Sequence, residues 1–199
     1  MSQINRQDDF PIRLFKSKES WAAWLDKNHH RSSGLWLRIA KKNAGVPSVS
    51  YADAIEVALC YGWIDGQKKP EDDETWLQKF VPRSDGSLWS KINREKAGAL
   101  IASGQMKPAG LAAIESAKNN GRWEAAYDSA RTATVPDDFA LALDANPRAR
   151  QFFEGLDRTN RYAVLWRIQT VKRAETRARK IAQFIDMLAR NEKIHPSRS

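Results

Sequence analysis

The chain of 199 residues contains one cysteine, Cys60, and three histidines. A single thiol excludes an internal disulfide bond, and these four residues are too few for the Cys/His clusters of structural zinc sites. No apolar run approaches the ~20 residues that a membrane-spanning helix needs, and residues 1–15 lack the apolar core of a secretory signal. We therefore expect a cytoplasmic protein without a membrane span or a bound metal.

Motifs of common enzyme classes are also missing. The sequence has no Gly-rich phosphate loop, no G-x-S-x-G and no H-E-x-x-H. His29 and His30 are adjacent and diverge by about 100° on a helix, which makes them a poor pair of metal ligands. We therefore assign no catalytic residue and no cofactor, and an enzyme of unknown reaction remains only a third hypothesis.

The composition, with 42% hydrophobic and 29% charged residues, is that of an ordinary globular protein. Two features stand out: eight tryptophans and a formal net charge of +9. Residues 148–199 hold 13 basic and 5 acidic side chains, a net charge of +8, whereas residues 1–147 are nearly neutral at +1. The positive charge is thus a local property of the last quarter of the chain, as is typical of surfaces that meet a polyanion or an acidic partner.

Hydrophobic periodicity and turn signals predict an α+β fold. A small, mostly antiparallel sheet from 35–41, 63–69 and 75–81 is expected to be covered by helices 17–29, 50–61, 88–102 and 108–119. Residues 124–137 are interpreted as a linker. The rest is expected to form an all-helical subdomain with helices 137–144, 147–155, 159–171 and 174–190. We accordingly predict two domains, an α+β domain over 1–130 and a basic helical subdomain over 137–199.

Four segments are similar to the YdeI/OmpD-associated family, whose members are also labelled bacteriocin-protection or OmdA-like proteins. They are LCYGWIDG (59–66), FVPRSDGSLWSKIN (80–93), MKPAGLAAIESAKNNGRWEAAYD (106–128) and KRAETRARKIAQFIDMLARNE (172–192). The resemblance spans roughly residues 17–192. It implies a link to an outer-membrane porin and to survival of antibacterial proteins or cationic peptides. It supplies no catalytic residues, and the missing export signal argues against a literal association with a porin.

Trp63 and Asp65 follow the end of a predicted helix, where a strand begins. An acid beside an aromatic wall suits a cationic or sugar-like ligand, or acts as a base if burial raises its pKa. The alternative is that Asp65 and Gly66 fix the transition from helix to strand while Trp63 fills the core.

Arg83, Trp89 and Asn93 form the other half of the predicted ligand site. Arg83 precedes the predicted helix 88–102, whose first N–H groups would help it to bind an anion or a carboxylate. Trp89 would stack on a planar ligand, with Asn93 on the same helix face. The alternative is that Ser87 caps the helix, Arg83 pairs with an acid of 72–74, and Trp89 is buried.

The C-terminal helices carry a predicted basic surface, composed of Arg161, Arg167, Arg173, Arg177, Arg179 and Lys180. Three interpretations stand: a nucleic-acid surface with Tyr162 or Trp166 for stacking, a patch for an acidic protein or anionic surface, and a solvated face on which Glu175 pairs with Arg179.

The leading functional hypothesis is a non-enzymatic protein that binds a small ligand or an acidic partner and protects against stress, bacteriocins or cationic peptides. The alternative is a nucleic-acid-binding protein that uses the basic helices.

Overall fold

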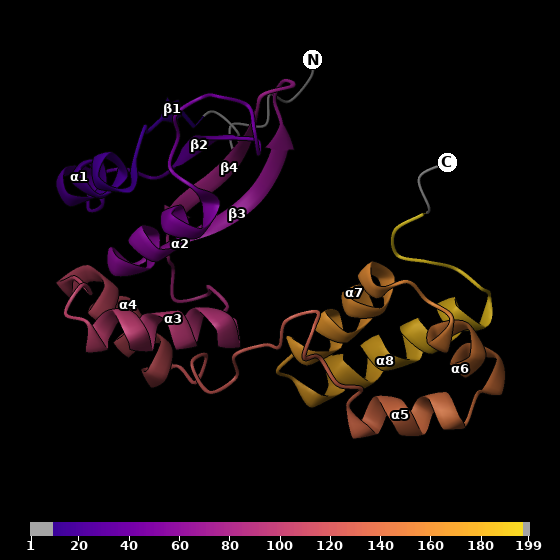
Figure 1. The fold of residues 1–199 in the computed structure, drawn as a ribbon. Coiled ribbons are helices and arrows are strands. Elements are labelled where there is room, and N and C mark those ends of the chain that lie inside the picture. Colours follow the sequence, from indigo (N-terminus) through magenta and orange to yellow (C-terminus); the bar gives the residue numbers. More distant parts are fainter. Residues whose placement is uncertain (1–9, 197–199) are drawn as a thin grey trace, which may run out of the picture. The chain divides into compact units, whose positions relative to one another are not determined.

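The structure is a computed structural model that describes residues 10–196. Its α+β fold confirms the expected class. The elements are β1 Ile12–Leu14, α1 Lys18–Asn28, β2 Leu35–Ala40, α2 Tyr51–Cys60, β3 Trp63–Pro70, β4 Thr75–Pro82, α3 Lys91–Ala102, α4 Pro108–Asn119, α5 Asp137–Asp144, α6 Pro147–Glu154, α7 Arg158–Gln169 and α8 Ala174–Ala189 (Figure 1).

The described chain divides into two compact units. The first contains the chain up to Ser87 together with Asn93–Glu124, and the second contains Leu88–Ile92 together with the chain from Ala125 onward. The four strands belong to the first unit, and α5 to α8 belong to the second.

The sheet has the strand order β1-β2-β4-β3. β2 pairs with β4, and β4 with β3, in antiparallel register, whereas β1 runs parallel to β2. The sequence predicted the three longer strands and missed β1. Its three residues are all exposed, so they show no alternation between buried and polar positions from which a strand could be recognised.

Polar side chains cap the N-termini of several helices. Ser17 accepts the backbone N–H of Ser20 to cap α1, and Ser50 accepts that of Asp53 to cap α2. In the second unit Asn146 caps α6 and Asp157 caps α7 in the same way. These bonds satisfy N–H groups that have no partner inside the helix, which explains why the predicted helix starts agree closely with the observed ones.

Aromatic rings form the core of the first unit. Trp21 stacks on Trp24 with ring centroids 5.6 Å apart, meets the edge of Trp63 at 6.2 Å and lies 5.7 Å from Phe80. Trp21, Trp63 and Phe80 are almost completely buried. Burial of each large ring stabilises the fold by roughly 2–3 kcal/mol, so this cluster fastens α1 to the sheet.

The predicted helix 88–102 begins three residues later than expected, at Lys91. Residues 88–90 instead run alongside the chain near Tyr127: Ser90 forms an isolated parallel bridge with Tyr127, and Tyr127 N–H donates to the Trp89 carbonyl over 2.9 Å. Ser87 does not begin the helix as a cap; its hydroxyl accepts the Ser84 N–H at 3.0 Å. Long-range pairing thus overrides the helical pattern of these residues.

The second unit is a small helical bundle with an aliphatic and aromatic core. Phe139 of α5 meets Phe153 of α6 edge to face at 5.3 Å. The other buried members come mainly from α7 and α8; they are Leu143, Ala149, Val164, Leu165, Ile168, Ile181, Phe184 and Leu188.

Candidate functional site

Trp63 lies in the core of the first unit. Its side chain is 1% exposed, lies in the aromatic core, and donates its indole N–H to the His29 carbonyl at 3.3 Å. Asp65 is half-buried two residues further along β3, and it accepts a hydrogen bond of 2.6 Å from the Tyr51 hydroxyl. The aromatic neighbour that the structure gives to this carboxylate is therefore Tyr51.

The other three predicted ligand residues, Arg83, Trp89 and Asn93, do not share one secondary-structure element. Arg83 follows β4, and its backbone N–H donates to the Gly62 carbonyl at 2.9 Å. Trp89 precedes α3, is 3% exposed and belongs to the second unit, whereas Asn93 lies in the first turn of α3 and belongs to the first. Because α3 starts at Lys91, whose N–H donates to the Tyr127 carbonyl, the expected free helix terminus beside Arg83 is wrong. The five residues as one ligand site stay a prediction.

Three of the six predicted basic residues use their side chains internally. The Arg161 guanidinium lies 4.5 Å from the centre of the Phe153 ring, Arg167 donates to the Ala163 carbonyl at 2.9 Å, and Arg177 forms an ion pair with Asp138. Arg173 and Arg179 are exposed, and Lys180 lies 5.8 Å from the centre of the Phe184 ring. Within residues 10–196, Arg177 alone of the three internally bonded arginines has its charge compensated by a carboxylate, and the basic surface stays a prediction.

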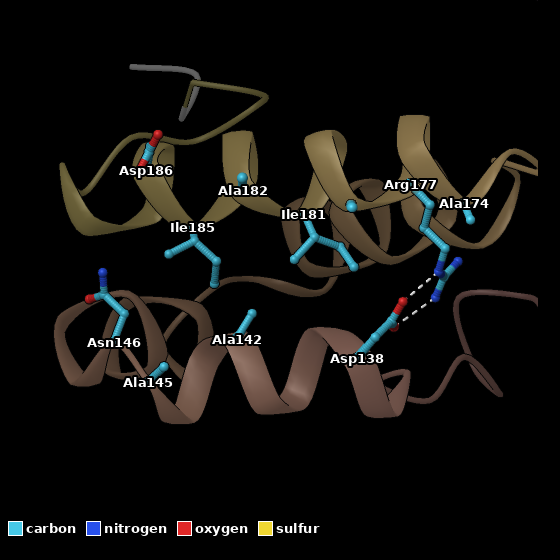
Figure 2. Close-up of a pocket in the computed structure, with 11 residues that line it drawn as sticks. Asp138, Ala142, Ala145, Asn146, Ala174, Arg177, Ile181, Ala182, Ile185 and Asp186 are labelled. Atoms are coloured by element: carbon cyan, nitrogen blue, oxygen red, sulfur yellow. Dashed lines mark hydrogen bonds and ion pairs between the residues drawn. The ribbon is translucent and has the colours of Figure 1, made fainter.

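A groove with a volume of about 610 Å³ lies between α5 and α8 of the second unit (Figure 2). Ile181 and Ile185 point from α8 toward α5, and Ala142 points back from α5 toward α8. The lining consists largely of alanine and isoleucine side chains: Ala142, Ala145, Ala174, Ala178, Ile181, Ala182 and Ile185. Side chains this small leave the two backbones accessible to a third element.

The groove is polar at both ends. At one end the Arg177 guanidinium donates from Nε to Asp138 Oδ2 at 2.6 Å and from Nη2 to Oδ1 at 2.8 Å. The paired guanidinium lowers the pKa of Asp138, and the carboxylate raises the pKa of Arg177. At the other end Asn146 and Asp186 line the groove (Figure 2).

The rim beside the groove combines an exposed leucine with carboxylates. Leu141 of α5 is 70% exposed and lies three residues from Asp138 and four from Ala145, so it is next to the lining on the helix surface. Asp137, Asp144, Glu175 and Asp186 are exposed on the same two helices. An apolar strip edged by carboxylates thus lies on a unit whose sequence is basic overall, and one of these carboxylates, Asp144, is ion-paired with Arg150 at 2.6 Å.

The titratable side chains of the lining are Asp138, Arg177 and Asp186. The lining offers no cysteine, serine or histidine that would act as a nucleophile or a general base. Among residues 10–196, no group of three or more His, Cys, Asp or Glu side chains is placed to hold a metal ion. Within the same residues no helix is long and apolar enough to cross a membrane.

The sequence reasoning missed this groove because its residues look ordinary one by one. The spacing of Ala178, Ile181, Ile185 and Leu188 is that of an ordinary apolar stripe on one helix, but only Ile181 and Leu188 are buried. Two signals were present: alanines at intervals of four, Ala174, Ala178 and Ala182, and a leucine flanked by aspartates in residues 137–144.

Comparison with known families divides the chain in a similar place. Residues 13–113 match the model described as domain of unknown function DUF8412, which is half of the chain. Residues 132–191 match the model described as bacteriocin-protection, YdeI or OmpD-associated, which confirms the resemblance seen in the sequence. The N-terminal segments at 59–66 and 80–93 fall within the DUF8412 match. No curated protein and no solved structure matches the chain. The chain therefore belongs to the DUF8412 family through residues 13–113 and carries a YdeI/OmpD-associated region over residues 132–191.

Proposed function

We propose that the protein is a non-enzymatic binding protein that protects against antibacterial peptides, and that the α5–α8 groove holds a cationic, amphipathic helix. The observation that carries the proposal is the groove itself, an apolar lining of alanine and isoleucine flanked by exposed carboxylates. The description of the matching family, bacteriocin protection, agrees with this class of partner.

Each part of the groove has a counterpart in such a helix. Apolar residues spaced at three and four positions would lie on Ala178, Ala182 and Ile185, and small side chains allow close approach of the helix. Lysines on the flanks would lie near Asp137, Asp144 and Asp186, where complementary charge raises the rate of association and selects the partner. A helix with acidic flanks would meet like charges there, which costs affinity.

The test compares two synthetic 20-residue amphipathic peptides with the same leucine face, one flanked by lysines and one by glutamates. Isothermal titration at moderate salt should show binding of the lysine peptide alone. Ala178→Phe and Ala182→Phe fill the groove and should weaken binding at least tenfold, which corresponds to about 1.4 kcal/mol. Gln183→Phe is the matched control, because it places the same ring about 100° away from residue 182, on the exposed side of α8.

Equal affinity for the two peptides would overturn the charge argument. Unchanged affinity of both groove variants, with intact thermal unfolding, would overturn the groove as the site. Cells that express Ala182→Phe should lose protection against a cationic peptide, whereas cells with Gln183→Phe should keep it.

Exposed Arg173 and Arg179 favour a second candidate, a weak nucleic-acid surface on α8. With these two arginines contacting phosphates, the logarithm of affinity should fall with the logarithm of salt with a slope of about −2. An Arg173→Glu/Arg179→Glu variant should lose this binding. Absence of binding to any single- or double-stranded probe at about 50 mM salt would remove the candidate.

A further inference from the structure

A second candidate site lies on the β3–β4 hairpin of the first unit, where a β-bulge changes the direction of one lysine. Asp65 pairs with Phe80, and Lys68 pairs with Gln78. Between these two pairs β3 advances by three residues and β4 by only two. Residues directly opposite each other in an antiparallel pair point to the same face of the sheet. The extra residue therefore brings Lys68 to the face that carries Asp65, whereas regular alternation would have placed it on the other.

The bulge is held by a buried side chain. Gln78 is 3% exposed, and its amide Nε2 donates to the carbonyls of Gly66 at 2.8 Å and Gln67 at 3.2 Å. These bonds occupy the backbone groups that the disrupted ladder leaves without strand partners. The position of Lys68 is thus built into the fold.

Lys68 points at an aromatic surface. Its ammonium Nζ lies 4.1 Å from the centre of the Trp76 ring, and Trp76 is on the same sheet face as Gln78 and Phe80. The Tyr51 ring meets Trp76 at an angle of 63° with centroids 5.5 Å apart, and the Tyr51 hydroxyl donates to Asp65. Trp76 thus contacts both the exposed Lys68 ammonium and the Tyr51 ring, and Tyr51 in turn contacts the Asp65 carboxylate.

We propose that Trp76, Tyr51 and Asp65 form a binding site for an organic ammonium ion, and that Lys68 is its tethered internal occupant. Ring faces attract cations through their quadrupole, and aromatic walls with a nearby acid are the usual solution for alkylated ammonium groups. Tyr51 is 38% exposed, so the site is accessible from solvent. Asp65, predicted from the sequence to accept a cation beside an aromatic wall, takes that role with Tyr51 and Trp76 in place of Trp63.

A tethered cation competes with a free one at an effective concentration in the millimolar range. The intact protein is therefore expected to bind a free ammonium weakly, and removal of Lys68 should reveal the intrinsic affinity. Lys69 provides a matched control, because its ammonium lies 4.3 Å from the Trp36 ring on the opposite face of the sheet.

The experiment titrates choline into the full-length protein and follows the indole N–H signals by NMR, with Trp76→Phe used to assign the Trp76 signal. Lys68→Ala should bind choline at least tenfold more tightly than the unmodified protein, and Lys69→Ala should not differ from it. The neutral isostere 3,3-dimethyl-1-butanol should bind Lys68→Ala at least tenfold more weakly than choline does. Ionic strength is held constant with sodium chloride, because charge attraction alone is screened.

Further variants separate the contributions within the site. In the Lys68→Ala background, Asp65→Asn should weaken choline binding several-fold while keeping the hydrogen bond to Tyr51, and Tyr51→Ala should weaken it further. Equal weak binding by Lys68→Ala and Lys69→Ala would overturn the proposal, as would equal affinity for choline and its neutral isostere. Neither result would affect the α5–α8 groove, which belongs to the other unit.

Discussion

Arg177 and Asp138 join α8 to α5 through two parallel hydrogen bonds of 2.6 and 2.8 Å at one end of the α5–α8 groove. The same guanidinium donates from Nη1 to the Ile168 carbonyl of α7 at 2.7 Å. One side chain therefore connects three helices and supplies a donor to a carbonyl near the end of α7, where helix carbonyls lack partners.

Removal of this connection should destabilise the second unit. Arg177→Ala is expected to lower the free energy of unfolding by about 2 kcal/mol, since it breaks three charge-assisted hydrogen bonds that are partly exposed. Arg177→Lys should recover less than half of the loss, because an ammonium cannot form the two-pronged contact. Urea denaturation followed by circular dichroism measures both. Arg179→Ala, on the exposed side of α8, is the control and should change stability by less than about 0.5 kcal/mol.

Two tyrosines, Tyr61 and Tyr162, are expected to make the stability of the fold depend on pH in the alkaline range. Burial, helped by Asp26, raises the pKa of Tyr61 to about 12, and burial, helped by Tyr127 and Asp128, does the same for Tyr162. A phenol whose pKa is higher in the folded state stabilises the fold fully below pH ~10, and this contribution is lost as the pH rises toward 12. Tyr61→Phe and Tyr162→Phe should each flatten the decline of stability between pH 10 and 12, as measured by urea denaturation. An unchanged pH profile in both variants would contradict the assignment.

Local signals predicted most of the fold, because they are chemical properties of short segments. Ser17 and Ser50 specify helix starts through their own side chains, and the alternating Leu35, Leu37 and Ile39 specify a strand, whose Trp36 is also buried. What the sequence could not supply is long-range pairing. β1 exists only because β2 offers it an edge, and residues 88–90 leave the helical pattern because Tyr127 pairs with them.

The candidate sites, like the fold, depend on long-range contacts that short segments of sequence do not indicate. The aromatic side chain that contacts Asp65 is Tyr51, which lies 14 residues before it in the chain and itself packs against Trp76. Trp63 seemed the natural wall because it is adjacent in sequence, yet hydrophobic burial placed it in the core. The α5–α8 groove depends on two helices that are about 30 residues apart, and neither helix alone indicates a groove.

The contact between Asp128 and Lys91 attaches the segment Leu88–Ile92 to the rest of the second unit. Its carboxylate meets the Lys91 ammonium at 2.7 Å and accepts the Gln169 amide at 2.8 Å. Burial alone would raise the pKa of Asp128, but the hydrogen bonds from Lys91 and Gln169 outweigh it and lower the pKa. This contribution to stability is therefore present above pH ~4 and is lost as the pH falls through the lowered pKa.

Replacement of the two partners should have unequal effects. Asp128→Ala should cost about 2 kcal/mol, because it leaves the Gln169 amide without its acceptor in a half-buried position. Lys91→Ala removes a half-exposed partner and should cost about 1 kcal/mol or less. NMR titration of the Asp128 carboxyl should show a higher pKa in Lys91→Ala than in the unmodified protein. A pKa that does not move would mean that Gln169, and not Lys91, lowers it.

Substitution by alanine should have opposite effects on stability at two helical glycines, Gly98 and Gly110. Gly110 of α4 lies against the carbonyls of Leu59 and Cys60 at the end of α2, and a Cβ atom there would overlap with both carbonyls and with the Met106 sulfur. Gly98, in the interior of α3, has open space around it. Gly98→Ala should therefore stabilise the protein by roughly 0.5–1 kcal/mol, because alanine restricts the unfolded chain and favours the helix. Gly110→Ala should destabilise it by roughly 1–3 kcal/mol, because α4 must move away from α2. Thermal unfolding of the two variants should show midpoints that shift in opposite directions, and a higher midpoint for Gly110→Ala would mean that α4 does not pack on α2 as closely as the structure shows.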